Sequence, residues 1–425
     1  MDKVLDTKTP YRVGQWLSSD QLFLENWMQN LIEEVDSNPR ELHPVIDEFK
    51  EFIEGSPEIY MFFHMMFEQI PHKPPYFQTP THKPQVRDYQ HMLRLLNAIM
   101  TKAPEYNNTG LVGFPINAIL DWPMGTIGGF SAFLNTKVNQ HIKKILNEWA
   151  RFLGSRDSCY VLNDSYNGWF GRAAMAQMLD FVEEYKCDPR KAHYGFTSWD
   201  DFFTREFRKG VRPISEPDND NVIVNACESA PYKIARDVKT RDRFWIKAQP
   251  YSLEHMLAED PLTDKFVGGT IYQAFLSAFS YHRWHSPVSG KVLKAYVTEG
   301  TYYSEVLSEG FLNPSGPDPS APNNSQAYLT EVAARALIFI EADNPAIGLM
   351  CFMSVGMSEV STNEITVYEG QHVNKGDQLG MFHFGGSTHC LIFRPEVNIE
   401  FDLHGQMPSL KSQNIPINSQ IARVK

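Results

Sequence analysis

The sequence predicts an α+β protein, in which a helical N-terminal domain is followed by a β-rich C-terminal domain. Apolar residues recur at helical spacing in the first 195 residues, whereas short β-rich runs recur after that point. The length of 425 residues also favours more than one packed unit. We therefore expect two domains, at residues 1–195 and 196–425.

Five stretches of the N-terminal domain have the helical pattern. They are residues 21–35, 43–55, 58–71, 90–104 and 138–155. Gly55 is expected to end the second of these helices. The third stretch, "EIYMFFHMMFEQIP", is apolar nearly all round, which fits either a buried core helix or a helix that docks on a membrane. No lysine or arginine flanks its apolar face, and this favours the core helix.

Seven runs of the C-terminal domain are rich in β-branched and aromatic residues and predict strands. They are residues 221–229, 243–248, 290–303, 335–342, 347–357, 364–370 and 378–386. Gly, Pro and Asp separate the runs, as is typical of turns between strands. The predicted order of elements is therefore helices first and strands second.

The charge balance and the apolar runs limit the classes of partner. Basic residues number 39 and acidic residues 51, a net charge of −12, and such a chain generally binds nucleic acid and anionic membranes poorly. The first residues, "MDKVLDTKTPYR", do not resemble a secretory signal or a transit peptide. The longest nearly apolar run, 346–357, is too short to span a bilayer. We expect a soluble protein with no nucleic-acid partner and no stable membrane anchor.

The five cysteines are dispersed, and none forms a CxxC pair. This pattern is typical of reduced thiols in a cytoplasmic protein and not of a disulfide framework or a zinc site. Two histidines three residues apart in "YHRWHSP" (281–287) also suggest a metal. No third ligand lies nearby in the sequence, so no metal site is predicted.

Three short stretches contain reactive residue types. "FGGST" (384–388) contains Ser387, "YHRWHSP" contains His282 and His285, and "NACES" (225–229) contains Glu228. Each has an ordinary structural explanation, which is a Gly-Gly-Ser turn, polar packing of two histidines, and the solvated end of a strand. Singly, none of them identifies a site.

Together, the stretches resemble the phosphatidylserine decarboxylase family. The family's Gly-Ser-Thr cleavage motif is matched at 386–388, and its YHRxHxP motif at 281–287. Further similar stretches are "FFTREFRKGVRP" (202–213), "IKAQPYSLEHML" (246–257) and "VNKGDQLGMFHFGGST" (373–388). The resemblance covers residues 195–390 and implies a catalytic domain of this family at 196–425. One departure is Cys227-Glu228-Ser229, where the family usually has Ala-Asp-Gly.

The resemblance implies that the chain cuts itself between Gly386 and Ser387. His285 acts as the base that takes the proton of the Ser387 hydroxyl, and Glu228 orients His285. The serine oxygen attacks the Gly386 carbonyl and forms an ester. Two glycines before the serine suit this step, because absent side chains permit an unusual backbone bend.

The cut gives a large chain, 1–386, and a small chain, 387–425, which are expected to stay associated. Elimination and hydrolysis convert Ser387 into a pyruvoyl group with loss of ammonia. The family uses this group to form a Schiff base with the substrate amine and to accept the electrons released by loss of CO₂. His282 is implied as the general acid that protonates the resulting carbanion. Pyridoxal phosphate is not expected, because no lysine motif for that cofactor is recognisable.

Resemblance to one branch of the family suggests the substrate. "YGFTSWDDFF" (194–203), "FIEADNPAIGL" (339–349) and "GMSEVST" (356–362) are similar to fungal members that decarboxylate L-tryptophan. We expect an aromatic L-amino-acid decarboxylase that converts L-tryptophan to tryptamine and CO₂. The alternatives are a phosphatidylserine decarboxylase that makes phosphatidylethanolamine, and an uncleaved binding protein.

Four side chains near the motifs are candidates for the substrate pocket. Trp284, Phe382 and Phe384 flank the chemistry, where they either stack on an indole or fill the core. Glu359, in "GMSEVST", is expected to bind a cationic or N–H donor group better than a phosphate.

Overall fold

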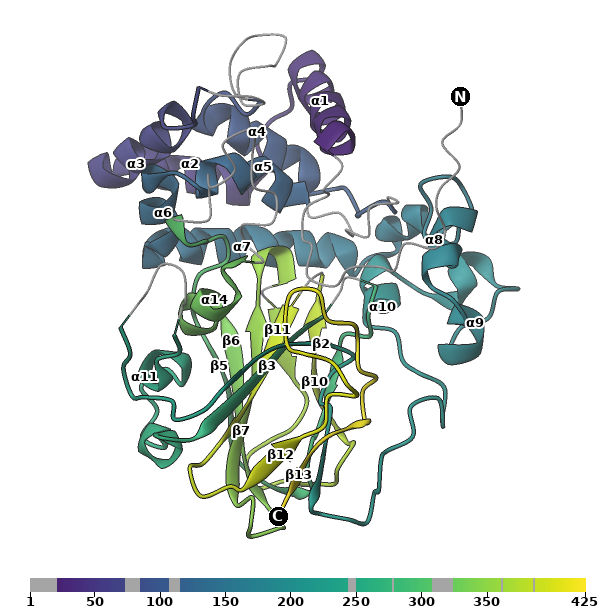
Figure 1. The fold of residues 1–425 in the computed structure, drawn as a ribbon. Helices are drawn as coiled ribbons and strands as arrows, with labels where there is room; N and C mark the ends of the chain where they lie inside the picture. The colour runs from purple at the N-terminus through teal and green to yellow at the C-terminus, as the bar shows by residue number, and fades with distance from the viewer. Residues whose placement is uncertain are drawn as a thin grey trace.

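We describe the protein from a computed structural model, which covers residues 21–72, 85–106, 115–243, 250–276, 279–307, 324–360, 362–384 and 387–425. Helices form one end of the molecule, and three antiparallel sheets form the other (Figure 1). This arrangement confirms the predicted α+β class.

The helical end extends from α1 to α10. Its elements are α1 (Gln21–Ser37), α2 (Pro44–Gly55), α3 (Pro57–Glu68), α4 (Tyr89–Ile99), α5 (Pro115–Met124), α6 (Ile127–Leu134), α7 (Thr136–Leu153), η1 (Arg156–Val161), α8 (Arg172–Gln177), α9 (Phe181–Glu184), η2 (Ala192–Gly195) and α10 (Trp199–Phe203). The five predicted helices correspond to α1, α2, α3, α4 and α7, and α2 ends at Gly55 as expected. The sequence pattern does not predict α5 and α6, because Pro123 lies inside one and two glycines lie inside the other.

The nearly apolar helix α3 lies in the helical core. Four of its apolar side chains are buried, and they are Ile59, Phe63, Met66 and Phe67. Helix α6 approaches it closely at Gly128, where a Cβ atom would lie 2.6 Å from the Met66 amide nitrogen. This burial supports the core helix over the membrane-docking alternative.

The β-rich end contains strands and a few short helices. Its elements are β1 (Val222–Val224), β2 (Ala230–Ala235), α11 (Leu253–Met256), η3 (Thr263–Phe266), β3 (Thr270–Leu276), β4 (Arg283–His285), β5 (Gly290–Thr298), α14 (Gln326–Val332), β6 (Arg335–Ala342), β7 (Leu349–Gly356), η4 (Ser358–Val360), β8 (Thr362–Ile365), β9 (His372–Val373), β10 (Gln378–His383), β11 (Ser387–Phe393), β12 (Ile399–Phe401) and β13 (Gln420–Val424). Helical structure continues past residue 195 to Phe203, and the domain boundary at 195 stays a prediction.

The largest sheet has seven strands in the order β2-β3-β11-β7-β6-β5-β9. Strand β11 is an interior strand between β3 and β7, and every one of its side chains is buried. Two smaller sheets have the orders β4-β10-β8 and β1-β13-β12. The chain after residue 387 therefore contributes one strand to the largest sheet and two to a smaller sheet.

Most of the predicted strands are present, but the seven runs do not include β2, β3, β4, β9, β11, β12 or β13. The run at 378–386 forms β10, which ends at His383, and the run at 243–248 lies largely outside the described residues. Strand β11, "STHCLIF", begins with three polar residues that follow two glycines, so its sequence looks like the continuation of a turn. Its position inside the sheet makes it a buried strand.

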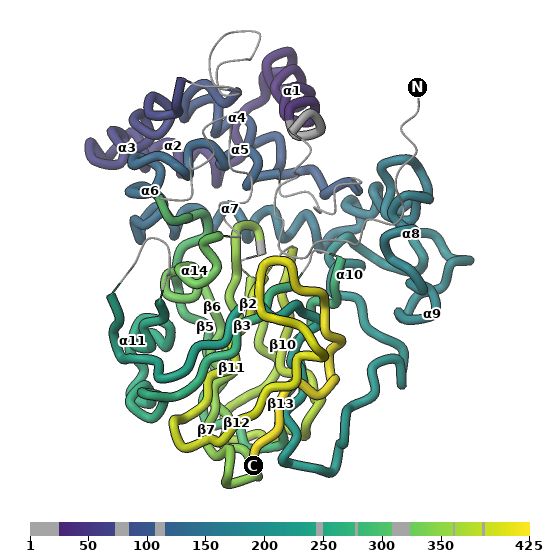
Figure 2. The backbone as a smooth tube through the Cα atoms, viewed as in Figure 1, coloured from purple at the N-terminus to yellow at the C-terminus, as the bar shows by residue number. Residues whose placement is uncertain are grey.

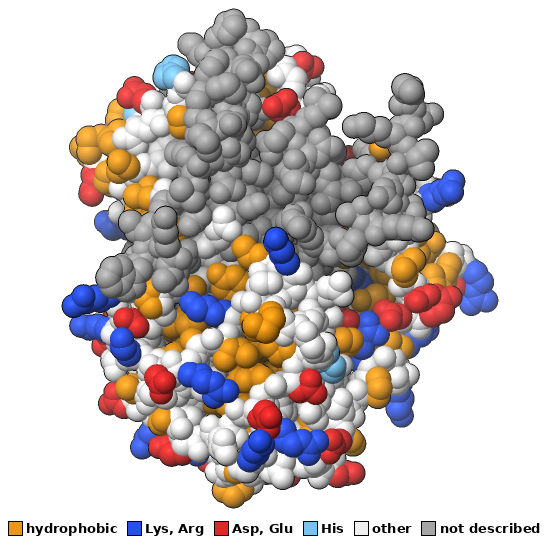
Figure 3. All heavy atoms as spheres, viewed as in Figure 1, with side chains coloured by type: hydrophobic (Ala, Val, Ile, Leu, Met, Phe, Trp, Pro, Cys, Tyr) orange, Lys and Arg blue, Asp and Glu red, His pale blue; other side chains and the backbone are white. Residues whose placement is uncertain are grey.

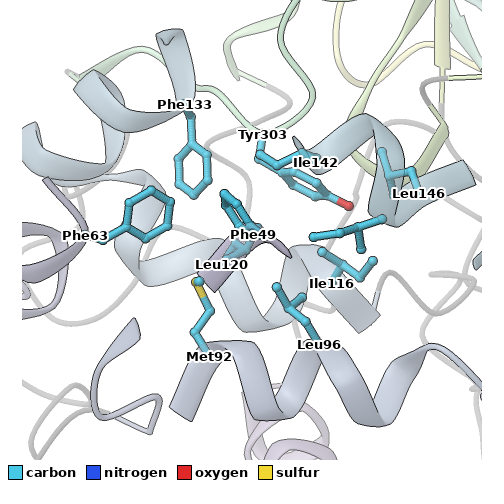
Figure 4. Close-up of a pocket in the computed structure, with 11 residues that line it drawn as sticks. Phe49, Phe63, Met92, Leu96, Ile116, Leu120, Phe133, Ile142, Leu146 and Tyr303 are labelled. Carbon is cyan, nitrogen blue, oxygen red and sulfur yellow. The ribbon is translucent and has the colours of Figure 1, made fainter. Parts of the chain in front are cut away.

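Helix α7 joins the helical end to the sheets and crosses their upper edge in the view of Figures 1 and 2. The amide of Tyr302, which follows β5, donates a hydrogen bond of 3.1 Å to the Asn139 side chain on α7. Tyr303 extends further and lines an apolar cavity among side chains of the helical end, such as Phe63 and Phe133 (Figure 4). The two ends of the molecule therefore share one hydrophobic core.

The cysteines and the surface of the described residues can be compared with the sequence. All five cysteines are free thiols. On the face shown in Figure 3, acidic and basic side chains are interspersed over the β-rich end. Within the described residues, no helix combines the length and the apolar character needed to cross a membrane.

Candidate active site

Ser387 is the first residue of β11 and lies opposite Leu276 of β3 and Gly356 of β7. Its side chain is fully buried, and its hydroxyl makes no hydrogen bond to another described residue. The next hydroxyl is held firmly, because Thr388 donates to the Ala274 carbonyl at 2.9 Å and accepts from the Gln273 amide at 3.1 Å. The Thr388 hydroxyl is therefore fixed, whereas the neighbouring Ser387 hydroxyl has no partner among the described residues.

The backbone just before the expected cut has an unusual conformation. Phe384 has φ of 79°, in the left-handed region that residues with a Cβ atom rarely adopt. Such a conformation persists only where the surrounding structure holds it. Gly385 and Gly386, the expected cleavage site with Ser387, lie outside the described residues.

His282 lies close to the end of β10, from which the chain enters the expected cleavage segment. Its carbonyl accepts a hydrogen bond of 2.9 Å from the Phe382 amide. Its ring is fully buried and stacks on Phe203, with ring centroids 3.9 Å apart and an interplanar angle of 22°. The sheet therefore places this histidine next to the segment that precedes Ser387.

His285 is the last residue of β4, and its side chain lies on the opposite face from Trp284, because side chains alternate along a strand. Its Nε2 atom is 3.0 Å from the Tyr281 hydroxyl, with which it shares a hydrogen bond. Burial lowers the pKa of His285 to about 4, so the imidazole is neutral near pH 7. A neutral imidazole is the form that accepts a proton.

Glu228 has a partner that differs from the expected histidine. Its carboxylate accepts hydrogen bonds from Arg212 at 2.9 and 3.1 Å, and from the Ile417 amide at 2.7 Å. Arg212 also donates to Glu184 of α9 at 2.8 Å. No hydrogen bond between Glu228 and His285 occurs among those found for the described residues. The partner of this carboxylate is thus an arginine in the "FFTREFRKGVRP" stretch.

Glu228 is still connected to His285 through neighbouring groups. The His285 amide donates to the Ala226 carbonyl at 2.8 Å, so the two segments run side by side. The Arg212 guanidinium lies 4.4 Å from the centroid of the Phe207 ring, which in turn stacks at 4.3 Å on Tyr281, the hydrogen-bond partner of His285. Glu228 is therefore placed to influence His285 through this chain of contacts.

The candidate pocket residues mainly fill the core or join elements. Trp284 is fully buried between Phe352 and Phe382, with ring centroids 5.5 and 5.0 Å away. Phe384 is also buried. A contact of these rings with substrate stays a prediction.

Glu359 anchors the helical end to the segment after β7. Its Oε1 atom accepts hydrogen bonds of 2.8 Å from the amides of Ile116 and Asn117 at the start of α5. Burial raises the pKa of Glu359 to about 7, although these amides oppose the shift. The carboxylate thus has a structural partner, and a substrate contact stays a prediction.

His389 is a further residue of this region that the sequence analysis did not single out. It shares a face of β11 with Ser387, is fully buried, and has no hydrogen bond from either ring nitrogen to another described residue. Burial lowers its pKa to about 3. Its ring stacks on Phe352, which also contacts Trp284 and so connects β11 with β4. The sequence signal that could have identified His389 is its position two residues after Ser387, in "GGSTHC".

Among the described residues, no group of three or more His, Cys, Asp or Glu side chains is arranged to hold a metal ion. The site consists instead of a serine, two histidines, a carboxylate paired with arginine, and aromatic rings.

Comparison with known proteins gives two family matches and several similar relatives. Residues 43–178 and 199–414 match two family models that are both described as phosphatidylserine decarboxylase. The L-tryptophan decarboxylase of Psilocybe cubensis is 39% identical, over 93% of this chain and 91% of the relative. The decarboxylase iboD of Amanita muscaria is 44% identical, over 73% and 91%. The phosphatidylserine decarboxylase proenzyme 3 of Schizosaccharomyces pombe is 32% identical, over 48% and 19%.

Proposed function

The chain belongs to the phosphatidylserine decarboxylase family, and we propose that it decarboxylates L-tryptophan to tryptamine after cutting itself between Gly386 and Ser387. The observation that carries the proposal is the buried Ser387 hydroxyl, which has no hydrogen-bond partner among the described residues. A buried polar group without a partner is costly and is often retained for function. The relatives named as proenzymes are consistent with a chain that is processed.

The residues around Ser387 fit the formation of a pyruvoyl group at this position. Position 387 is enclosed between β3 and β7, where water has little access. A pyruvoyl group there supplies a carbonyl that condenses with the substrate amine and accepts the electrons released with CO₂. We propose that this group, and not pyridoxal phosphate, is the cofactor.

In the cleavage step, the Ser387 oxygen bonds to the carbonyl carbon of Gly386 while its proton passes to His285. The peptide C–N bond between the two residues breaks, His285 returns the proton to the departing nitrogen, and an ester now joins the two residues. Loss of the Cα proton of residue 387 and breakage of its Cβ–O bond then release the Gly386 carboxylate and cut the chain. Water converts the remaining dehydroalanine to the pyruvoyl group with release of ammonia. His285 suits both transfers because burial keeps it neutral at the start. Glu228 supports it through Arg212, Phe207 and Tyr281.

In the decarboxylation step, we assign His282 the protonation of the product carbon. It lies on the side of β4 that includes Trp284, and Trp284 contacts the Phe352 ring next to His389 on β11. That route leads to the face of β11 on which Ser387 lies. We therefore assign the two halves of the reaction to His282, directly before β4, and to His285, at the end of that strand.

The two chains are expected to stay together after the cut. Strand β11 pairs over its whole length, Ser387–Phe393, with β3 on one side and β7 on the other. Strand β13 pairs with β1, and the Ile417 amide donates to Glu228. The chain 387–425 thus supplies an interior strand of the largest sheet, and we expect it to stay bound to the chain 1–386.

The substrate assignment rests on the relatives, of which two that cover most of the chain are named L-tryptophan decarboxylases. Phosphatidylserine is the second candidate, because both family models carry that name. The decarboxylase iboD, whose name gives no substrate, is more identical at 44% but over a smaller share of this chain, 73%. We propose a cytoplasmic enzyme that acts on a free amino acid.

Intact-mass spectrometry of the purified protein tests the processing. A fragment of about 4 kDa, the mass of residues 387–425 at ordinary composition, should begin with a pyruvoyl group, and S387A should stay uncut. A panel of tryptophan, tyrosine, phenylalanine and phosphatidylserine vesicles tests the substrate, with and without added pyridoxal phosphate. Release of tryptamine that does not respond to pyridoxal phosphate is expected. An uncut wild-type chain, or turnover of lipid alone, would contradict the proposal.

A further inference from the structure

The short helix α10, which belongs to the "YGFTSWDDFF" stretch, contacts the active site at several points. Trp199, Asp200 and Phe203 each touch a different residue of the candidate site. None of the three was assigned a role from the sequence. Their contacts share one feature, because all of them lead to His282, directly before β4, or to the residues just before the expected cut.

Asp200 holds the end of β10. Its Oδ1 atom lies 2.8 Å from Nδ1 of His383, and Glu364 of β8 lies 2.9 Å from the other ring nitrogen. Although burial alone would lower it, these two carboxylates raise the pKa of His383. The side chain of His383 is only 12% exposed, so the pair with Asp200 is shielded from solvent. It fixes the backbone four residues before Ser387.

Trp199 covers the next residue, Phe384. The two rings stack with centroids 6.4 Å apart at 27°, and Trp149 of α7 lies 6.2 Å from the same ring. Both tryptophans are fully buried. These rings restrict the side chain of the residue with positive φ, and such a backbone conformation needs restriction from its surroundings.

Phe203 and the residues that follow it hold His282. Phe203 stacks on the imidazole of His282. Arg205 donates hydrogen bonds to the carbonyls of Phe279 and Ser280, which precede His282 in the chain. Arg283 donates in return to the Thr204 carbonyl at 2.7 Å. Residues 199–205 therefore hold both His282 and the two residues, His383 and Phe384, that precede the expected cleavage site.

We propose that α10 is a positioning element for self-cleavage, in which Asp200 and Trp199 hold His383 and Phe384 so that the Gly386 carbonyl meets the Ser387 hydroxyl. The inference rests on the proposed function, since it concerns the same cut. It goes further in giving the helical end a part in the chemistry of the β-rich end. Asp200 and Trp199 act through other residues and touch no reacting atom.

The test compares D200A with D201A and D200E. Asp201 is a matched control on the same helix, because its carboxylate accepts from Thr197 and not from β10. For each purified chain, intact mass against time gives the rate of the cut at 386/387, and thermal unfolding gives the melting temperature. The cut in D200A should be at least about tenfold slower, because a displacement of about 1 Å at a reacting group can cost about a hundredfold.

Rescue separates positioning from general stability. D200E keeps the carboxylate and should recover most of the rate at a melting temperature close to that of D200A. W199F keeps a ring against Phe384, and its rate should exceed that of W199A. If D200A does not fold, H383Q removes the same ion pair from the β10 side and takes its place.

Several outcomes would overturn the proposal. D200A that is cut as fast as wild type, D200E that is as slow as D200A, or unfolding of both D200A and H383Q while D201A folds would each do so. A wild-type chain that is never cut contradicts the proposed function itself. A wild-type chain that is cut, beside an equally fast D200A, contradicts only the role of α10.

Discussion

Replacement of Arg212 by methionine should destabilise the protein severely. The arginine side chain is 18% exposed and lies between Glu228, whose side chain is 10% exposed, and Glu184. R212M keeps much of the apolar length of the side chain but removes the cation. Glu228 would then remain buried away from solvent. Of its hydrogen-bond donors, the Ile417 amide would be left to compensate its charge.

The expected loss follows from the cost of an uncompensated buried charge. Removal of one partner of a buried ion pair costs about 3–5 kcal/mol. For a domain of about 150–250 residues, each kcal/mol lowers the melting temperature by about 2–4 °C, so R212M should lose about 6–20 °C. An exposed pair costs about 1 kcal/mol or less, so R190M, which removes the partner of Asp188 at the surface, is the control.

The loss should also depend on pH. Burial already raises the pKa of Glu228, and Arg212 opposes the shift, so R212M should raise that pKa further. A carboxyl whose folded-state pKa is raised destabilises the fold as pH rises from the unfolded value towards the folded value. The difference between R212M and wild type should therefore be larger at about pH 8 than at about pH 5.

Thermal unfolding at the two pH values measures both effects in wild type, R212M, E228Q and the double variant R212M/E228Q. The double variant should be more stable than R212M, because no charge is left unpaired at position 228. The reasoning fails if R212M loses no more than R190M, if its loss is equal at both pH values, or if the double variant is the least stable of the four.

Three further predictions concern buried groups and glycines. Burial raises the pKa of Glu359 to about 7, so the stability of the wild type should fall as pH rises through 7. E359Q should make this fall smaller when melting temperatures are measured against pH. Unchanged tryptophan kinetics in E359Q would exclude a substrate contact. Burial lowers the pKa of His389 to about 3, so stability should fall as pH drops from about 6.5 towards 3, and H389F should reduce that fall in the same measurement. At Gly380 a Cβ atom would lie 2.2 Å from the Glu364 carbonyl oxygen, so G380A should lose more than G370A in denaturant unfolding. Gly370 has open space around it, so G370A should lose only the cost of placing an alanine at a φ of 88°, about 1 kcal/mol. Equal losses of stability in the two variants would contradict this.

Local pattern predicted the elements whose sequences agree with their final environment. The amphipathic helices α2 and α7 and the continuous apolar strands β6 and β7 are of this kind. The helices α5 and α6 contain proline or glycine, and only close packing against neighbours stabilises them as helices. Strand β11 begins with Ser, Thr and His, which are buried because pairing with β3 and β7 encloses them. Tertiary contacts outweighed local preference in these elements.

In the candidate site, too, the sequence predicts the reactive residues but not the residues that contact them. Motifs identified Ser387, His282 and His285. Ser387 begins β11 of the seven-stranded sheet, whereas His285 ends β4 of the β4-β10-β8 sheet and His282 directly precedes β4. The motifs could not identify the contacts of α10, because Asp200 lies 183 residues from His383 in the chain. Contacts of this kind form only when the helical end packs against the sheets, so a local sequence pattern does not predict them.

The family resemblance implies that Glu228 orients His285, and in the structure the Glu228 carboxylate accepts its hydrogen bonds from Arg212 and Ile417. The expected arrangement pairs this carboxylate with His285, but burial lowers the pKa of that histidine to about 4 and leaves it neutral. A neutral imidazole cannot compensate a buried negative charge, whereas the guanidinium of Arg212 is always charged and offers two donors to one carboxylate. The carboxylate therefore binds the arginine, and the histidine remains free to accept a proton. In this arrangement the two requirements of the proposed cleavage, a neutral base and a stable buried carboxylate, are met by separate residues.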